Sequence, residues 1–321
     1  MTRLLAAALL AASPAAAFEL QNPVDCEIGR DCFLQQYVDH DDGPDARDLA
    51  CGPRSYDGHK GTDIRLATTQ EISRGVDVLA AAGGIVQGVR DGMEDIASNA
   101  PNAPDIAGKE CGNGVVVDHE NGWSTQYCHL LKGSVTVAPG DRVAGGAVLG
   151  EIGLSGQTEF PHLHITLRQG NTVVDPFTGA AMGSACGSGG GSLWAAESGI
   201  TYTPGGLMSA GVTDRVPDYA EVKDSAPHSD RYPADVPALV MWGHFFGLEK
   251  GDRLETRLLA PSGAVVAEAT HVMDRPRATE FRAVGRRIPQ RGWPAGTYRG
   301  ISRLIRGEKT VAEMERVAEI R

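Results

Sequence analysis

Positive charge, aromatic side chains and long apolar runs are all scarce in this 321-residue sequence. Lys and Arg number 30 against 41 Asp and Glu, and the resulting formal net charge of −11 argues against a nucleic-acid-binding protein, which usually carries a basic patch. Beyond residue 17 no stretch approaches the roughly 20 apolar residues of a transmembrane helix. The cysteines include no Cys-x-x-Cys pair, which argues against a cysteine-based zinc site or thioredoxin-like chemistry.

Glycine, by contrast, is abundant, with 41 residues, and it separates short apolar runs between residues 76 and 176. This pattern predicts short strands joined by tight turns, hence a mostly β chain with an antiparallel-sheet domain. A Gly/Ser-rich stretch at residues 187–192 indicates a boundary, and the evenly spaced strand-like runs after it predict a small C-terminal β-sandwich. The predicted divisions are a loop-rich segment (18–57), the sheet domain (58–186), a linker (187–199) and the sandwich (200–321).

The N-terminus has the pattern of a secretory signal peptide over residues 1–17. Arg3 precedes an apolar run at residues 4–12, and small residues follow at 15–17. We therefore expect export to the periplasm or the medium. In such an oxidising compartment the even number of cysteines favours up to three disulfides.

A hairpin is predicted between Cys111 and Cys128, because two strand-like runs flank the turn signal Asn121-Gly122. Folding this hairpin brings the two cysteines opposite each other, so we predict that they pair; the other pairings stay open. The acidic stretch at residues 39–45 does not match the spacing of a calcium loop, and we interpret it as a solvated loop without a metal.

Four histidines lie in three short motifs that indicate chemistry. His59 precedes Asp63 by four positions, His129 ends a predicted strand, and His162 and His164 alternate along another. Residues i and i+2 of a strand point to the same face, so the last two imidazoles should share one site. A hydrolytic zinc site needs about three protein ligands and one open position. His59, Asp63 and one histidine of the pair would provide those ligands, and the other histidines could move protons or stabilise an oxyanion.

These motifs, together with Gly58 to Asp63, Thr125 to Leu130, the run from Val143 to Gly153 and Pro161 to His164, closely resemble the M23 family of zinc metallopeptidases, the lysostaphin and LytM-like peptidoglycan endopeptidases. The resemblance covers about residues 58–176. It implies one zinc ion held by His59, Asp63 and His164, and catalytic roles for His129 and His162. It also implies a groove over an antiparallel sheet, in which an extended peptide can lie.

The resemblance therefore predicts a secreted or periplasmic zinc endopeptidase that hydrolyses peptide cross-links of peptidoglycan. The alternatives are a catalytically silent, wall-binding or hydrolase-activating LytM-type module, and a secreted protease that cuts Gly-rich peptides. We expect residues 91–109 to form a loop beside the groove, and residues 18–57 could lie across it. The C-terminal domain either binds the wall or a protein partner, or packs against the catalytic domain.

Overall fold

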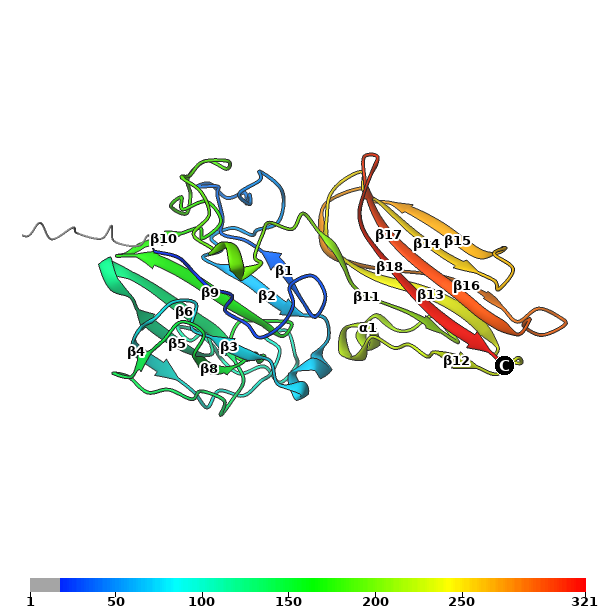
Figure 1. Cartoon of the computed structure of the whole chain (residues 1–321), viewed down its shortest axis with the longest axis horizontal. Coiled ribbons are helices and arrows are strands. Elements are labelled where there is room, and N and C mark those ends of the chain that lie inside the picture. The colour runs from blue at the N-terminus through cyan, green and yellow to red at the C-terminus, as the bar shows by residue number, and fades with distance from the viewer. Residues whose placement is uncertain (1–17) are drawn as a thin grey trace, which may run out of the picture.

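The computed structural model describes residues 18–321 and shows two regions of antiparallel sheet side by side (Figure 1). The predicted signal peptide falls on residues 1–17, outside the described residues. Within the described part, no helix has the length and apolar character needed to cross a membrane. The mostly β fold class with a second β domain is confirmed.

The first region is built on an eight-stranded antiparallel sheet. Seven strands follow the order β1, β2, β9, β6, β5, β4, β7, and β10 pairs with β9. Their bounds are β1 (Cys32–Gln36), β2 (Thr62–Leu66), β4 (Gly84–Arg90), β5 (Asn113–Asp118), β6 (Trp123–Leu130), β7 (Arg142–Val143), β9 (His162–Gln169) and β10 (Thr172–Val174). A separate pair consists of β3 (Asp77–Leu79) and β8 (Val148–Glu151), and short 3-10 turns occur at η1 (Thr69–Arg74), η2 (Glu120–Gly122) and η3 (Ala196–Ser198).

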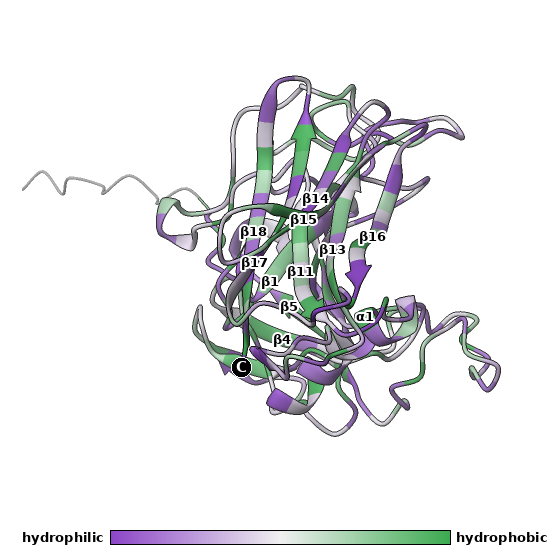
Figure 2. Ribbon diagram, turned by 90° about the vertical axis from the view of Figure 1, so that its right-hand side faces the viewer, coloured by the Kyte–Doolittle hydropathy of each residue, from purple (hydrophilic) through white to green (hydrophobic). Residues whose placement is uncertain are grey.

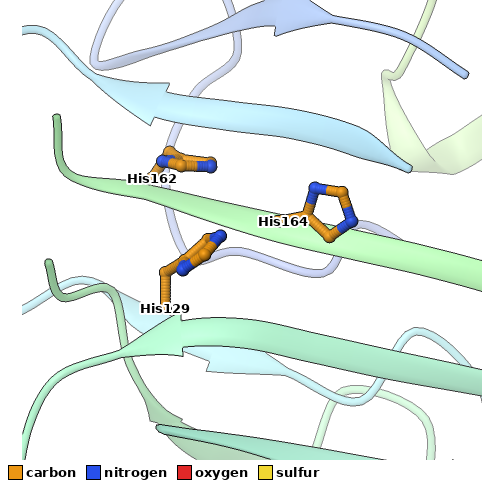
Figure 3. A group of neighbouring side chains, drawn as sticks. All are labelled: His129, His162 and His164. Atoms are coloured by element: carbon orange, nitrogen blue, oxygen red, sulfur yellow. The ribbon is translucent and has the colours of Figure 1, made fainter. Parts of the chain in front are cut away.

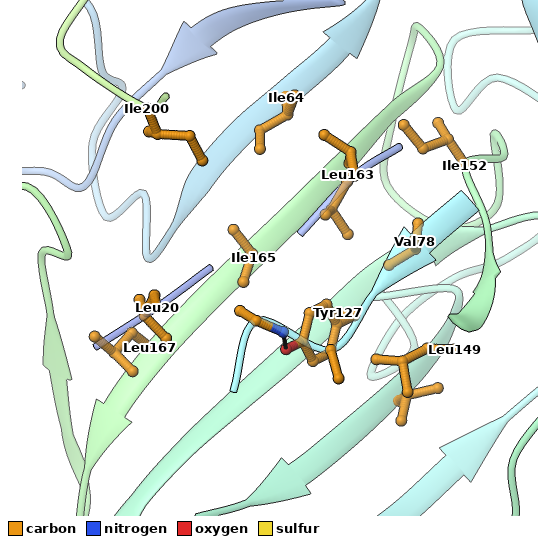
Figure 4. Packing of buried hydrophobic residues seen from close by; sticks show 14 of the residues in the cluster. Leu20, Ile64, Val78, Tyr127, Leu149, Ile152, Leu163, Ile165, Leu167 and Ile200 are labelled. Carbon is orange, nitrogen blue, oxygen red and sulfur yellow. Dashed lines mark hydrogen bonds between the residues drawn. The ribbon is translucent and has the colours of Figure 1, made fainter. Parts of the chain in front are cut away.

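One face of this sheet is hydrophobic because apolar residues alternate with polar ones along its central strands. In β9, Leu163, Ile165 and Leu167 enter the core, where Val78 of β3 joins them (Figure 4). The hydroxyl of Tyr127 accepts a hydrogen bond from the amide of Ala81 at 2.7 Å, so its one polar atom is satisfied inside the core. The opposite face of the same strands is left for polar side chains.

The predicted hairpin is present in β5 and β6. Asn121 and Gly122 both have positive φ values, 60° and 77°, which fits the preference of this pair for left-handed turn positions. The predicted Cys111–Cys128 disulfide is confirmed, with the two Cα atoms 4.8 Å apart. The remaining cysteines form two further disulfides, Cys26–Cys32 and Cys51–Cys186.

The second region is a sandwich of two sheets. Its three-stranded sheet has the order β11, β13, β16, and its five-stranded sheet has the order β12, β18, β17, β14, β15. The bounds are β11 (Gly206–Thr213), β12 (Arg231–Tyr232), β13 (Ala238–Leu248), β14 (Arg253–Leu259), β15 (Val265–Val272), β16 (Arg277–Arg287), β17 (Gly296–Arg306) and β18 (Lys309–Ile320), with one helix, α1 (Tyr219–Ser225). Buried and exposed residues alternate along β14 and β18, as expected for strands with one buried face, whereas β11 and β13 are buried along nearly their whole length (Figure 2).

The acidic stretch is solvated at Asp42 and Asp45, which are exposed, but the interpretation as a solvated loop fails at Asp39. Asp39 is fully buried, and its carboxylate accepts hydrogen bonds from three backbone amides, those of Asp41, Arg47 and Gly58. His40 is buried as well. The interpretation was wrong because a run of carboxylates usually faces water, whereas here the surrounding chain supplies donors for the first of them.

The Gly/Ser-rich stretch is held against the first sheet domain. Cys186 is disulfide-bonded to Cys51, and the amide of Gly191 donates to the carbonyl of Thr178 at 3.1 Å. Trp194 and Ile200, which follow the glycines, are buried in the first hydrophobic core. The domain boundaries given above stay predictions.

Candidate functional site

Three adjacent strands bring the sequence-predicted residues together on the polar face of the first sheet. β9 lies between β2 and β6, with His164 opposite Asp63 on one side and opposite Cys128 on the other. His162 lies two residues before His164 on the same face, as the alternation predicted. His59 and His129 join them from the turn before β2 and the end of β6.

His59, Asp63 and His164 form a compact set of donor atoms. Asp63 Oδ1 lies 3.2 Å from His59 Nε2 and 2.8 Å from His164 Nδ1, and the two nitrogens are 3.1 Å apart. Four ligands at about 2.0–2.1 Å around a tetrahedral zinc ion would be about 3.3 Å from one another. Two imidazoles and one carboxylate at this spacing therefore fit zinc, and they leave a fourth position open.

Both imidazoles of this set are oriented by hydrogen bonds at their other ring nitrogen. His59 Nδ1 donates to the carbonyl of Tyr37 at 2.7 Å, and His164 Nε2 bonds with the hydroxyl of Thr166 at 3.0 Å. Such outer contacts fix which nitrogen is left with a lone pair and are typical of histidines that bind metals.

The turn that carries His59 is held by buried Asp39. The Asp39 carboxylate accepts the amide of Gly58 at 2.9 Å, and the Asp39 amide donates to the carbonyl of His59 at 2.9 Å. Gly61 then crosses β9 so closely that a Cβ atom there would lie 2.5 Å from the carbonyl oxygen of Ile165. Glycine at this position lets the chain bring His59 and Asp63 over the same point.

His129 reaches the site through a bulge. The pairing of β5 and β6 shifts between Asn113 and Gly114, so His129 is an extra residue between two paired positions. Its φ of 66° lies in the left-handed region, which is unfavourable for residues with a Cβ atom. In a regular strand His129 would point away from the face that Cys128 occupies; the bulge turns its side chain to the cavity.

The rings of His129, His162 and His164 gather over β6 and β9 (Figure 3). His129 Nδ1 donates to the carbonyl of Ser155 at 2.8 Å, which leaves Nε2 for the cavity. His162 Nδ1 lies 3.0 Å from both the carbonyl of Phe160 and the hydroxyl of Thr158, and its Nε2 lies 3.5 Å from Asp63 Oδ1. Each ring thus has one fixed nitrogen and one that faces the shared centre.

Electrostatics divide these residues into two roles. Burial alone would raise the pKa of Asp63, but the neighbouring imidazoles of His59 and His162 hold it well below its ordinary value. Burial, reinforced by the neighbouring imidazoles, keeps the pKa of His129 well below its ordinary value. Burial also lowers the pKa of His162 to about 4. At neutral pH the carboxylate is therefore ionised, while His129 and His162 are neutral and can accept a proton.

These residues line a cavity of about 560 Å³. Its walls come from several distant segments, including Gln35, Gln36, Tyr56, Lys60, Ser98, Gln126, Gln157, Phe160, Arg168 and Ala278. Ser98 lies within residues 91–109, which we expected to form a loop beside the groove. Residues of the N-terminal segment form a side wall here, while Leu20 and Val24 of the same segment pack into the core.

Sequence reasoning missed the residues that orient the histidines. The acceptors at Tyr37, Ser155 and Phe160 are backbone carbonyls, which any residue type provides, so no sequence signal could have found them. Asp39 carried a signal that we misread as solvent exposure. The bulge at His129 had no signal in the sequence, because the usual one is a glycine at the left-handed position.

A sheet domain with clustered metal-type donors beside two neutral histidines has the arrangement of a hydrolytic metal centre. Residues 57–176, a little over a third of the chain, match the model of Peptidase family M23, and the chain is similar to this family over that part.

The curated relatives are similar over this part alone. The chain is 32% identical over 108 residues to the DD-carboxypeptidase/endopeptidase Mpg of Neisseria meningitidis serogroup B, covering 34% of this chain and 23% of that protein. It is 34% identical over 107 residues to the cell division protein DipM of Caulobacter vibrioides, covering 33% of this chain and 16% of that protein. The chain thus spans less than a quarter of the length of either relative.

Among solved structures, the first domain is similar to the catalytic domain of the antimicrobial peptidase lysostaphin from Staphylococcus simulans. The identity is 21%, the match covers 37% of this chain and 76% of that chain, and the TM-score is 0.27.

Proposed function

We propose that this protein is an exported, zinc-dependent endopeptidase that hydrolyses peptide cross-links of peptidoglycan. The observation that carries the proposal is the set of His59, Asp63 and His164 donor atoms, all within 3.2 Å of one another, beside His129 and His162 in one cavity. The match of residues 57–176 to Peptidase family M23 supports a peptidase.

His59 Nε2, Asp63 Oδ1 and His164 Nδ1 would hold one zinc ion. When bound, zinc supplies Lewis acidity, which polarises a peptide carbonyl and makes water more acidic. The protein's contribution is to keep these three donors in place, through Tyr37, Thr166 and the turn that Asp39 stabilises. An ionised Asp63 between two imidazoles suits a divalent cation, because the carboxylate offsets part of its charge.

His129 and His162 would move the protons of the reaction. Both are neutral near pH 7, and both have Nδ1 bonded to the protein, so Nε2 is the atom that exchanges a proton. One of them takes a proton from the attacking water, and the protonated ring can pass it to the leaving amine. The other could donate a hydrogen bond to the oxyanion on the carbonyl oxygen only in its protonated form, because the neutral ring keeps its one N–H at Nδ1.

The substrate class follows from the walls of the cavity and from the relatives. The amide side chains of Gln35, Gln36, Gln126 and Gln157 line the cavity, and they can hydrogen-bond the backbone of a peptide that has little side-chain bulk. The name of the relative Mpg describes a DD-carboxypeptidase and endopeptidase, which favours a D,D-peptide bond in a cross-link. The three disulfides fit an exported protein.

The test is cleavage of purified cross-linked muropeptides by the full mature chain, followed by the release of a new amino group. We expect one zinc ion per chain, loss of cleavage on treatment with a chelator, and recovery when zinc is returned. A zinc-replete protein that releases no new amine from these muropeptides would contradict the proposal. Cleavage of pentaglycine in preference to the cross-link would instead support a protease for Gly-rich peptides.

A further inference from the structure

The two domains are joined by the connecting chain segment and also by buried side-chain contacts. Phe33 and Ala67 of the first domain pack with Met208 and Phe246 of the sandwich, and the rings of Phe33 and Phe246 are 5.6 Å apart. Buried Arg54 lies over the Phe246 ring and donates to the carbonyl of Thr203 at 2.5 Å. This interface fixes how the sandwich sits beside the sheet.

Fixed in this way, the sandwich extends to the catalytic cavity. Ala278, the second residue of β16, is exposed and lines the same cavity as His129, His162 and His164. The next residue is anchored, since Thr279 Oγ1 hydrogen-bonds with the Tyr219 hydroxyl of α1 at 2.8 Å. Helix α1 in turn contacts the first domain, where Thr69 Oγ1 donates to the carbonyl of Lys223 at 3.4 Å.

The cavity wall at this end is linked to the catalytic histidines. Gln35 is 4% exposed, lines the cavity, and accepts a hydrogen bond from Arg65 Nη1 at 2.5 Å. The guanidinium of Arg65 lies 4.4 Å from the centre of the Phe160 ring, which itself is 4.6 Å from the His162 ring. Gln35, Phe160, His162 and Ala278 all line this one cavity, so a peptide bound in it beside His162 can extend between residues of both domains.

We propose that the second domain forms one end of the substrate groove, so that the peptide binds across both domains. This inference rests on the proposed function, because it assigns to the same site a further part of its substrate contacts. The ligand at this end is a stretch of peptide with small side chains, since Ala278 presents only a methyl group to the cavity and since the amide of Gln35 can pair with a backbone group. The sandwich thus sets how far the peptide can extend past the scissile bond.

The test measures peptide binding without turnover. Calorimetry would measure the dissociation constant of a cross-linked muropeptide dimer for three full-length proteins. The first is the His162→Ala variant, the background protein, and the other two carry Ala278→Trp or Ala264→Trp in addition. Ala264 is a matched control, because it is also an exposed alanine of the second domain and lies outside the cavity, in the turn between β14 and β15. Because the indole would fill the groove end, Ala278→Trp should weaken binding at least about tenfold, with the control unchanged.

The outcomes separate the two proposals. Equal binding by all three proteins would overturn the groove end and leave the proposed function intact. No binding by the background protein would reject the muropeptide substrate class, and the groove end with it. Equal loss by both tryptophan variants would also reject the inference, because the effect would not depend on the cavity. Unfolding curves and zinc content confirm that each variant is folded.

Discussion

His40, His59 and His164 each have a ring nitrogen next to a carboxylate, yet they differ in how their ring nitrogens are used. His40 is 3% exposed, with Nδ1 bonded to the carbonyl of Ser184 at 3.1 Å and Nε2 bonded to Asp175 Oδ2 at 2.7 Å. Both of its nitrogens are therefore occupied by fixed partners. His59 bonds at Nδ1 to the carbonyl of Tyr37, whereas its Nε2 faces Asp63 Oδ1 at 3.2 Å and His164 Nδ1 at 3.1 Å, which belong to the same candidate donor set.

The use of the ring nitrogens distinguishes a histidine of a candidate metal or catalytic site from one in a structural hydrogen bond, and it does so better than burial or sequence spacing. Within four positions His40 has three acidic neighbours, Asp39, Asp41 and Asp42, and His59 has two, so sequence neighbours would not single out His59. A metal or a further proton can bind only at a ring nitrogen that carries no hydrogen, and both nitrogens of His40 face acceptor oxygens, to which the protonated ring donates. The contrast predicts that substitutions of the cavity histidines impair zinc binding or cleavage and change the free energy of unfolding only modestly. Substitution of His40 should lower the free energy of unfolding and leave zinc binding unchanged.

The largest effect is expected for His59→Ala. Removal of one of three ligands should abolish stoichiometric zinc binding and lower cleavage at least about 10³-fold, because a bound metal stabilises developing charge by several kcal/mol. Elemental analysis together with muropeptide cleavage checks this result. His271→Ala is a matched control, since His271 lies on β15 of the second domain and outside the cavity. Full zinc content in the His59 variant would contradict the ligand assignment.

His162→Ala sharpens the division between ligands and proton carriers. Because His162 is not among the three donor atoms within 3.2 Å of one another, this variant should keep one zinc ion per chain. Loss of a positioned acid or base should lower kcat by about 10²–10⁴-fold. The measurement is kcat with parallel zinc analysis. Simultaneous loss of zinc and activity would place His162 among the ligands instead.

Much of the site could be predicted from the sequence because its signals are local. The alternation of His162 and His164 with Leu163 and Ile165 follows from strand geometry, and the Asn121-Gly122 turn explains why Cys111 meets Cys128. These inferences needed only neighbours in the chain. The five candidate residues do gather at one cavity, but the roles assigned to them stay proposals.

The rest depends on contacts between distant segments. His40 meets Asp175, which is 135 positions away, so nothing near His40 in the sequence indicated that it would be buried. The same holds for Ala278, which reaches the cavity from the second domain. The bulge at His129 is set by the pairing register of two strands, and a periodicity argument assumes that this register is unbroken.

His40→Ala tests whether His40 contributes to the stability of the fold and not to zinc binding. The substitution leaves the buried Asp175 carboxylate without its histidine partner, so the free energy of unfolding should fall by about 3–5 kcal/mol. Zinc content should remain one ion per chain, because no cavity donor is touched. Denaturant unfolding of the zinc-loaded protein measures the first quantity and elemental analysis the second. A stable variant that lacks zinc would show that the distinction between the two kinds of histidine is wrong.

The same pair predicts a pH dependence of stability. Burial alone would lower the pKa of His40, but the hydrogen bond to Asp175 and its charge raise it above the ordinary value. Protonated His40 therefore favours the folded state; its contribution is full below the unfolded pKa of about 6.5 and is lost as pH rises through the folded pKa. The stability difference between wild type and His40→Ala should shrink on going from pH 6.5 to 9. A difference that is constant or grows over this range would contradict the assignment.

The smallest effect concerns the backbone conformation of His129, a cavity residue whose position lowers the stability of the fold. Because its φ is 66°, a residue with a Cβ atom is strained there, and the strain is the structural cost of turning the imidazole to the cavity. His129→Gly and His129→Ala should both lose activity, but the glycine variant should be more stable than the alanine variant by about 1 kcal/mol. Unfolding curves of the two variants measure this difference.

Gln126 provides the control, because it lies on the same strand without a positive φ. There the order should reverse, since glycine in a strand interior is less stable than alanine by roughly 0.5–1 kcal/mol. If alanine is the more stable residue at both positions, His129 carries no strain and the bulge is the preferred local conformation of this chain.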